Sequence, residues 1–180
     1  MTYTTNHFGP FYLTYSLFDS LKKAKEGRII NVSSMAHYYS TENFLDDLAC
    51  DKKYDSWDQY NNSKFMNVLF ASGLNNLFQE KNIQNLKSAS LHPGIVSTGF
   101  GSENCLVKVF RCCLCCIVKQ SEGGSASTLH VCRIPFEELK SGEYYDDDTK
   151  HKEMDKKGRD QELVKKLWQI SEKAYGIKFD

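Results

Sequence analysis

Two short apolar runs, each preceded by a long helical pattern, constrain the fold of this chain more than any other feature. The runs RIINVSS (residues 28–34) and NLKSASL (residues 85–91) are short, apolar and bounded by turn-forming or polar segments, which is typical of buried strands. Apolar residues at helical spacing cover Phe8–Leu21 before the first run and residues 56–79 before the second. The sequence therefore predicts strands that are joined by helices, as in parallel βαβ units.

The rest of the chain continues this alternation. We expect a helix over Glu122–Cys132, a short strand around Tyr144 and Tyr145, and a terminal helix over Asp160–Tyr175. The mixed-charge stretch YYDDDTKHKEMDKKGRD (residues 144–160) is typical of a solvated loop. The polar segment over residues 35–59 is predicted to be a long loop. The expected fold class is α/β, a single domain with about three parallel strands and flanking helices.

The charge balance and the amino-terminal residues limit the partners and the compartment of this chain. Lys plus Arg and Asp plus Glu balance at 23 each, so no net field would attract nucleic acid. The amino-terminal residues MTYTTNHFG lack the basic and apolar regions of a secretory signal, so we expect a cytoplasmic setting and reduced thiols for the 7 cysteines.

Five of these cysteines crowd into one segment. The stretch Cys105–Val118 is about 14 residues long and contains Lys108 and Arg111, too short and too charged to span a bilayer. Its thiol spacing does not match the C-x₂-C pairs of zinc sites, so no metal site is predicted. We expect a buried or interfacial helix with peripheral membrane association, and cysteine acylation at a membrane surface is an open alternative.

Tyr60 and Lys64 lie four positions apart in the second predicted helix, which places them on one face. Such pairs occur by chance in many amphipathic helices. They also have a chemical use, because a unit charge at about 4 Å and an effective dielectric of 20 is worth roughly 4 kcal/mol. That corresponds to about 3 pKa units, which would bring a phenol near neutral pH, where acid–base catalysis is effective.

Other polar and turn-forming residues follow the ends of the predicted strands, where parallel sheets collect functional groups. Together with Asn6 in TNHFGPFYLT, the segments GRIINVSSMAH, YNNSK and SLHPGIVSTGF resemble the short-chain dehydrogenase/reductase family. The tail SEGGSASTLHVC, with SGEYY and LWQISEKAYG, is similar to the retinol dehydrogenase-like branch of that family.

The resemblance implies a set of site residues. The catalytic residues would be Asn6, Ser34, Tyr60 and Lys64, with Tyr60 as acid–base, Ser34 on the substrate oxygen and Asn6 on a proton-relaying water. The cofactor-binding residues would be Tyr60, Lys64, Pro93, Gly94, Ile95, Val96 and Thr98. Ser34 is favoured over Ser33 because the family's serine is the second of such a pair.

The implied reaction is hydride transfer between NAD or NADP, with NADP slightly favoured, and the alcohol or carbonyl of a retinoid-, steroid- or lipid-like substrate. The implied location is the cytoplasm or the cytoplasmic face of an internal membrane. His37 and His92 are interpreted as structural residues. Tyr38, Tyr39 and Trp57 would either line a substrate cleft or pack within the loop.

The chain departs from the family at its beginning, where the glycine-rich phosphate loop, the ribose selector and the Asn-Ala-Gly segment are missing. We therefore expect the carboxyl-terminal half of a Rossmann-like doubly wound parallel sheet. The alternative function is a non-catalytic truncated remnant that keeps the fold without binding a cofactor.

Overall fold

A computed structural model of the chain describes residues 1–52, 54–94, 121–146 and 150–179. The chain begins with a π-helical turn, η1 (Thr4–Phe8), that leads directly into α1 (Gly9–Lys22). Pro10 has no N–H, so the carbonyl of Asn6 four residues earlier cannot receive the usual α-helical hydrogen bond. The N–H of Gly9 instead donates to the carbonyl of Thr4, five residues back. The proline therefore accounts for a π-helical turn, in place of an α-helical one, at Asn6.

The sheet contains four strands in the order β1 (Gly27–Val32), β2 (Leu86–Leu91), β3 (Glu143–Tyr145) and β4 (His151–Lys152). The first three strands are parallel, and β4 pairs antiparallel with β3. Within the described part of the chain, β1 has β2 as its one strand neighbour.

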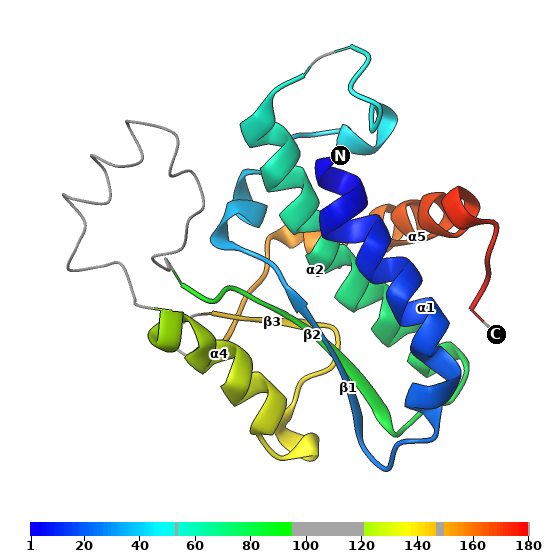
Figure 1. The fold of residues 1–180 in the computed structure, drawn as a ribbon, viewed down its shortest axis with the longest axis vertical. Coiled ribbons are helices and arrows are strands. Elements are labelled where there is room, and N and C mark those ends of the chain that lie inside the picture. The colour runs from blue at the N-terminus through cyan, green and yellow to red at the C-terminus, as the bar shows by residue number, and fades with distance from the viewer. Residues whose placement is uncertain (53, 95–120, 147–149, 180) are drawn as a thin grey trace.

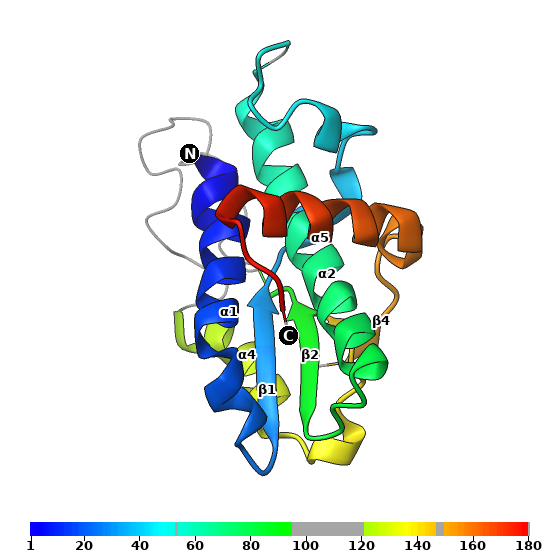
Figure 2. The same ribbon diagram turned by 90° about the vertical axis from the view of Figure 1, so that its right-hand side faces the viewer.

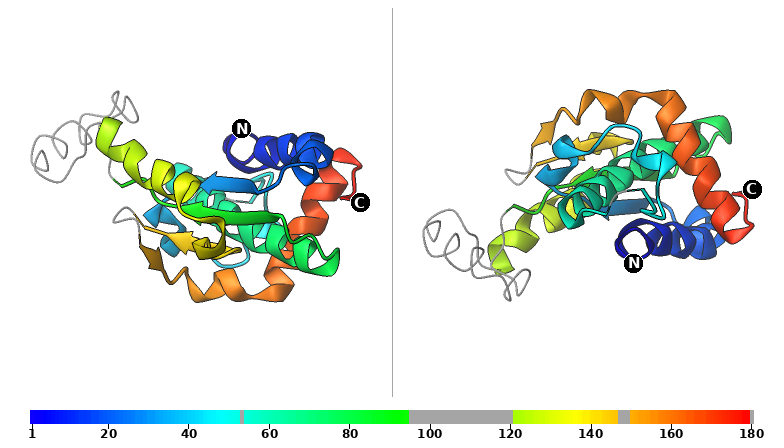
Figure 3. Two further views of the ribbon diagram at one scale, coloured as in Figure 1. Left: turned by 90° about the horizontal axis from the view of Figure 1, so that it is seen from below. Right: turned by 90° about the horizontal axis from the view of Figure 1, so that it is seen from above.

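Helices cover both faces of this sheet, which confirms the expected α/β class (Figure 1). Along β1, Ile29 packs into the cluster formed with α1 and α2 (Ser56–Glu80), and Ile30 packs with Val131 of α4 (Ser121–Arg133) on the other face. Seen along the sheet, α4 lies on one side and α1 and α5 (Gln161–Tyr175) lie on the other (Figure 3). This alternation follows from the two-residue period of a strand.

The terminal helix α5 packs across α2 (Figure 2). The crossing is close at Gly73 of α2, where an added Cβ would lie 2.7 Å from the Cε3 atom of Trp168. Asp160 caps α5 by accepting hydrogen bonds from the N–H groups of Glu162 and Leu163, which explains why the helix begins at Gln161.

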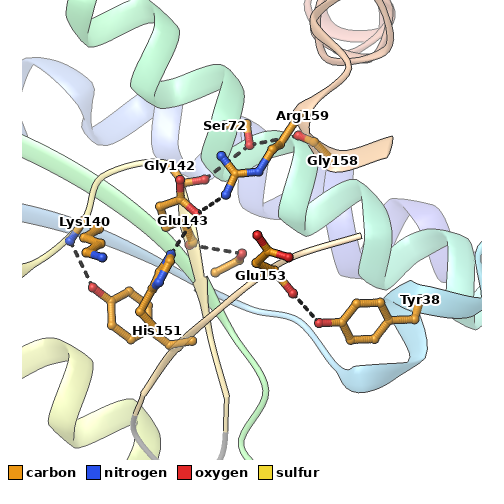
Figure 4. Close-up of polar contacts among 11 residues, drawn as sticks. Tyr38, Ser72, Lys140, Gly142, Glu143, His151, Glu153, Gly158 and Arg159 are labelled. Carbon is orange, nitrogen blue, oxygen red and sulfur yellow. Dashed lines mark hydrogen bonds and ion pairs between the residues drawn. The ribbon is translucent and has the colours of Figure 1, made fainter. Parts of the chain in front are cut away.

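The segment after β3 is more ordered than the sequence predicts. The expectation of a plain loop is wrong for β4 and for the 3-10 turn η5 (Lys156–Arg159). The Glu143 Oε2 atom accepts from His151 Nε2 at 3.0 Å and from Arg159 at 3.1 Å, which fastens both elements to β3 (Figure 4). Side chains of the stretch thus bond to Glu143 just before it and, in the pair Lys152 and Asp146, to one another.

The predicted loop between β1 and α2 also contains two 3-10 turns, η2 (Met35–Tyr39) and η3 (Phe44–Asp46). Phe44 and Leu45 are buried in the core against α2, so this segment is anchored at its middle. In the portion of the chain that is described, no helix is long and apolar enough to cross a membrane. The cysteine segment Cys105–Val118 lies outside the described residues.

Candidate active site

The first full turns of α2 carry the two residues that the sequence singled out, Tyr60 and Lys64. The Lys64 ammonium donates to the carbonyl oxygen of Val32, the last residue of β1, at 3.2 Å. It lies 5.7 Å from the centroid of the Tyr60 ring. Burial lowers the pKa of Lys64, because removal from water disfavours the ammonium form. The helix therefore holds a phenol and a partly desolvated cation at the carboxyl end of a parallel strand.

Asn67 joins this contact although the sequence reasoning missed it. Its Nδ2 atom donates to the same Val32 carbonyl oxygen at 3.1 Å. The available signal was positional, because Asn67 follows Lys64 by three residues and so shares its helix face. The end of β1 is held by two side chains of one helical turn.

The two serines after β1 have different partners. Ser33 is buried, and its hydroxyl donates to the backbone carbonyl of Lys64 at 2.7 Å. Ser34 is half-buried, and its Oγ atom accepts from the N–H of Ala36 at 3.2 Å, which caps η2. A serine oxygen that accepts still has its own O–H to donate. Ser34 can thus offer a proton to an oxygen atom, whereas the proton of Ser33 is already used.

Asn6 reaches the same turn of α2 through Ser63. The Asn6 Nδ2 atom donates to Ser63 Oγ at 3.0 Å, and the Ser63 hydroxyl donates to the backbone carbonyl of Tyr60 at 2.8 Å. Ser63 was not predicted as a site residue. Its side chain connects the amino-terminal π-helical turn to the helical turn that bears Tyr60 and Lys64.

The predicted cofactor-binding turn follows β2. Gly94 has φ of +86°, in the left-handed region that favours glycine, and Pro93 precedes it. The N–H of His92 donates to the carbonyl of Tyr145 at 2.9 Å, so the end of β2 is tied to β3. Ile95, Val96 and Thr98, the other predicted cofactor-binding residues, lie outside the described residues.

The histidine and the aromatic residues before and within the start of α2 divide into packed and exposed side chains. His37 is completely buried, and the Tyr38 hydroxyl donates to the carbonyl of Glu153 (Figure 4). Tyr39 and Trp57 are 71% and 64% exposed, so their rings face solvent. Tyr38 therefore packs within the protein, while Tyr39 and Trp57 remain available to a ligand. Among the described residues, no three His, Cys, Asp or Glu side chains are grouped as metal ligands.

Comparisons with known proteins match the chain to one protein family. Residues 1–105 match the family model for short chain dehydrogenase. Human retinol dehydrogenase 14 is 34% identical over 181 residues, which cover 98% of this chain and 52% of that protein. The chain thus spans about half the length of the curated relatives that it matches.

Two solved structures show the same fold at low sequence identity. A crystal structure of an uncharacterised protein from Mycobacterium paratuberculosis has a TM-score of 0.76 and 24% identity, covering 99% of this chain and 59% of that one. A crystal structure of NADPH-bound carbonyl reductase from chicken fatty liver has a TM-score of 0.58 and 23% identity, covering 84% of this chain and 55% of that one.

Proposed function

The chain belongs to the short-chain dehydrogenase family, and on that premise we propose that it is the catalytic part of an NAD(P)-dependent oxidoreductase. The reaction would transfer hydride between the nicotinamide and the alcohol or carbonyl carbon of an apolar substrate. The observation that carries the proposal is the set of contacts around one helical turn. Val32 and Ser33 at the end of β1, and Asn6 through Ser63, all bond to the segment of α2 from Tyr60 to Asn67.

In this proposal Tyr60 gives a proton to the carbonyl oxygen of the substrate, or takes one from its alcohol. Lys64 stabilises the phenolate form of Tyr60 by its positive charge. The Ser34 hydroxyl donates to the same substrate oxygen as negative charge develops on it. Asn6 holds a water molecule that returns the proton to bulk solvent. NAD(P) supplies or accepts the hydride.

The residues that are described fit such a cofactor. An ammonium group has three N–H donors, and Lys64 uses one of them on the Val32 carbonyl, which leaves donors for ribose hydroxyls. The left-handed Gly94 has no side chain at the carboxyl end of β2, so its backbone can pass close to a flat ring. By family resemblance, Pro93, Ile95, Val96 and Thr98 would bind the nicotinamide end. NADP is the favoured form.

We assign the substrate to the apolar class, retinoid-, steroid- or lipid-like. Human retinol dehydrogenase 14, the relative described above, is named for a lipid-like alcohol. Exposed apolar side chains also flank the proposed catalytic residues in the chain: Met35 follows Ser34, and Trp57 precedes Tyr60 by less than one helical turn. The segment Cys105–Val118 would place the enzyme at the cytoplasmic face of an internal membrane, where such substrates dissolve.

The test uses a chimera that joins residues 1–180 to the part of human retinol dehydrogenase 14 that the match does not cover. Changing Tyr60→Phe removes the proton donor and keeps the ring, so kcat should fall by about 10²–10⁴-fold. The dissociation constant for NADP should stay within about twofold of the parent value, because the phenyl ring preserves the packing. Steady-state kinetics and calorimetry measure the two quantities.

Tyr54→Phe is the matched control, since Tyr54 is 71% exposed and lies just before the same helix. It should leave kcat unchanged. Retention of more than about a tenth of kcat by the Tyr60→Phe chimera would contradict the role of Tyr60 as acid–base residue.

A further inference from the structure

His37 lies between the proposed catalytic Ser34 and a segment more than a hundred residues later in the chain. Its Nδ1 atom is 2.8 Å from the carbonyl oxygen of Ser34. Its Nε2 atom is 3.3 Å from the backbone N–H of Asp155, which donates to it. One imidazole ring therefore spans from the end of β1 to the residue that precedes η5.

These two contacts fix the state of the ring. A carbonyl oxygen can only accept, so Nδ1 must carry the proton, and a backbone N–H can only donate, so Nε2 must present a lone pair. The ring is therefore neutral, with its single proton on Nδ1. His37 is fully buried, and burial lowers its pKa, which opposes protonation of Nε2. Asp155, Asp146 and His92 are the titratable groups whose charges act on it.

Two aromatic rings also pack against the imidazole. The Tyr38 ring centroid lies 3.9 Å from that of His37, and the Tyr144 ring centroid lies 4.5 Å away. The Tyr38 hydroxyl is itself fixed by its bond to the Glu153 carbonyl in the segment between β4 and Asp155 (Figure 4). The imidazole is thus packed against two tilted aromatic rings and hydrogen-bonded at both nitrogens.

The hydroxyl and the carbonyl of Ser34 both belong to this arrangement. Its Oγ atom accepts from the N–H of Ala36, and its carbonyl oxygen accepts both from the backbone N–H of His37, at 3.1 Å, and from the ring Nδ1, so the turn η2 folds back on Ser34 from two sides. The direction of the Ser34 hydroxyl depends on the orientation of this turn. Segment 153–155 bonds to this turn at two places, the Nε2 atom of His37 and the hydroxyl of Tyr38.

We propose that His37 is a positioning residue: the Nδ1–H of its neutral tautomer holds the Ser34 carbonyl and so sets the direction of the Ser34 hydroxyl, while its Nε2 contact with Asp155 keeps the proton on Nδ1. The proposal rests on the proposed function for its kinetic consequence and on geometry alone for its structural one. Misplacement of a catalytic group by about 1 Å can cost on the order of 10²-fold in rate.

Three substitutions of His37 in the chimera separate the two contacts. His37→Phe keeps a ring and removes both hydrogen bonds. His37→Asn places an amide N–H near the position of Nδ1 and keeps a donor to Ser34, while His37→Gln places its terminal amide near Nε2 and keeps an acceptor for Asp155. We expect kcat to fall at least about 10-fold for His37→Phe and His37→Gln, and to recover to within about threefold of the parent for His37→Asn.

The KM for NADP should stay within about twofold in all three variants, because the hydrogen bonds of the ring go to Ser34 and Asp155 and not to the turn at Gly94. His151→Gln is the control, because His151 lies in β4, just before segment 153–155, but bonds Glu143 and not Ser34. It should leave kcat unchanged. An equal loss of kcat in His37→Asn and His37→Phe, or a comparable loss in His151→Gln, would overturn the proposal.

Nuclear magnetic resonance tests the same geometry if the parent chimera shows no turnover, an outcome that would refute the proposed function alone. The ¹⁵N shifts of the His37 ring at pH 7 should report a protonated Nδ1 and an unprotonated Nε2. The carbonyl ¹³C shift of Ser34 should move in His37→Phe and return in His37→Asn. A ring protonated on Nε2, or a Ser34 carbonyl shift that is unaffected by His37→Phe, would refute the positioning role.

Discussion

The buried histidine of the amino-terminal turn, His7, should make stability depend on pH in a defined way. Its Nε2 atom is 2.9 Å from Ser171 Oγ. The Ser171 hydroxyl donates to the carbonyl of Leu167 at 2.8 Å, so the His7 ring must donate from Nε2 and keep a lone pair on Nδ1. Nδ1 has no hydrogen-bond partner among the described residues. Complete burial lowers the pKa of His7 from 6.5 to about 3.

The sign of the effect follows from these values. The unfolded chain binds a proton at His7 near pH 6.5, whereas the folded chain does so near pH 3. Acid therefore favours unfolding, and stability that is fully present above pH 6.5 is lost as the pH falls toward 3. The limiting slope is about 1.4 kcal/mol per pH unit, so at pH 5 the loss from His7 is about 2 kcal/mol. That is a sizeable part of the roughly 5–15 kcal/mol that stabilises a typical domain.

The assay is urea unfolding of the chimera and of its His7→Phe variant at pH 7 and pH 5. A phenyl ring fits among Phe8, Phe11 and Phe70, whose rings surround His7, and it does not titrate. Losing the bond to Ser171 shifts the stability of the variant by the same amount at both pH values. The stability advantage of the parent over the variant should therefore be about 2 kcal/mol smaller at pH 5.

An advantage that does not change between the two pH values would refute a buried neutral His7. Should His7→Phe prevent folding, the ring resonances of His7 in the parent provide a second readout. These resonances should stay at the positions of a neutral ring down to pH 5. A titration midpoint near pH 6.5 would also refute a buried neutral His7.

Three further outcomes are expected. Residues 1–180 alone should associate, as seen by light scattering, because the described structure leaves one side of β1 without a strand neighbour. They should not bind NAD or NADP with micromolar affinity in calorimetry. A soluble monomer that binds either cofactor would contradict this prediction. Gly73→Ala should lower stability by about 1–3 kcal/mol in thermal unfolding, because the new Cβ would overlap Trp168, and an unchanged Tm would refute that contact. Changing Cys112, Cys113, Cys115 and Cys116 to Ser in the chimera should reduce its flotation with liposomes, and unchanged membrane association would exclude the proposed anchoring.

Local signals made much of the fold predictable. The run RIINV was recognised because a buried parallel strand is apolar on both faces, as Ile29 and Ile30 are. The terminal helix was predicted over Asp160–Tyr175, and the structure has it over Gln161–Tyr175 with Asp160 as its N-cap. The helix face shared by Tyr60 and Lys64 follows from spacing alone.

Contacts between distant segments were not predictable in the same way. Strand β4 is only two residues long and exists because it pairs with Tyr144 and Tyr145, so no periodicity announces it. Ser63 and Asn67 look like ordinary polar residues of a helix surface, and their use depends on where Asn6 and the end of β1 come to lie. The π-helical turn at Asn6 had a local cause in Pro10, and only its hydrogen-bond register needed the structure.

The place of α5 has a consequence for synthesis on the ribosome. Its residues Val164 and Leu167 belong to one apolar cluster, Trp168 packs against a second, and Ser171 bonds His7 at a separation of 164 residues. At roughly 5–20 residues per second, about 8–30 s pass between the synthesis of His7 and that of Ser171. Through that interval the aromatic face of α1 and α2 has no helix to cover it. We therefore expect these aromatic side chains of the nascent chain to stay exposed until α5 has left the exit tunnel, which is the interval in which aggregation competes with folding.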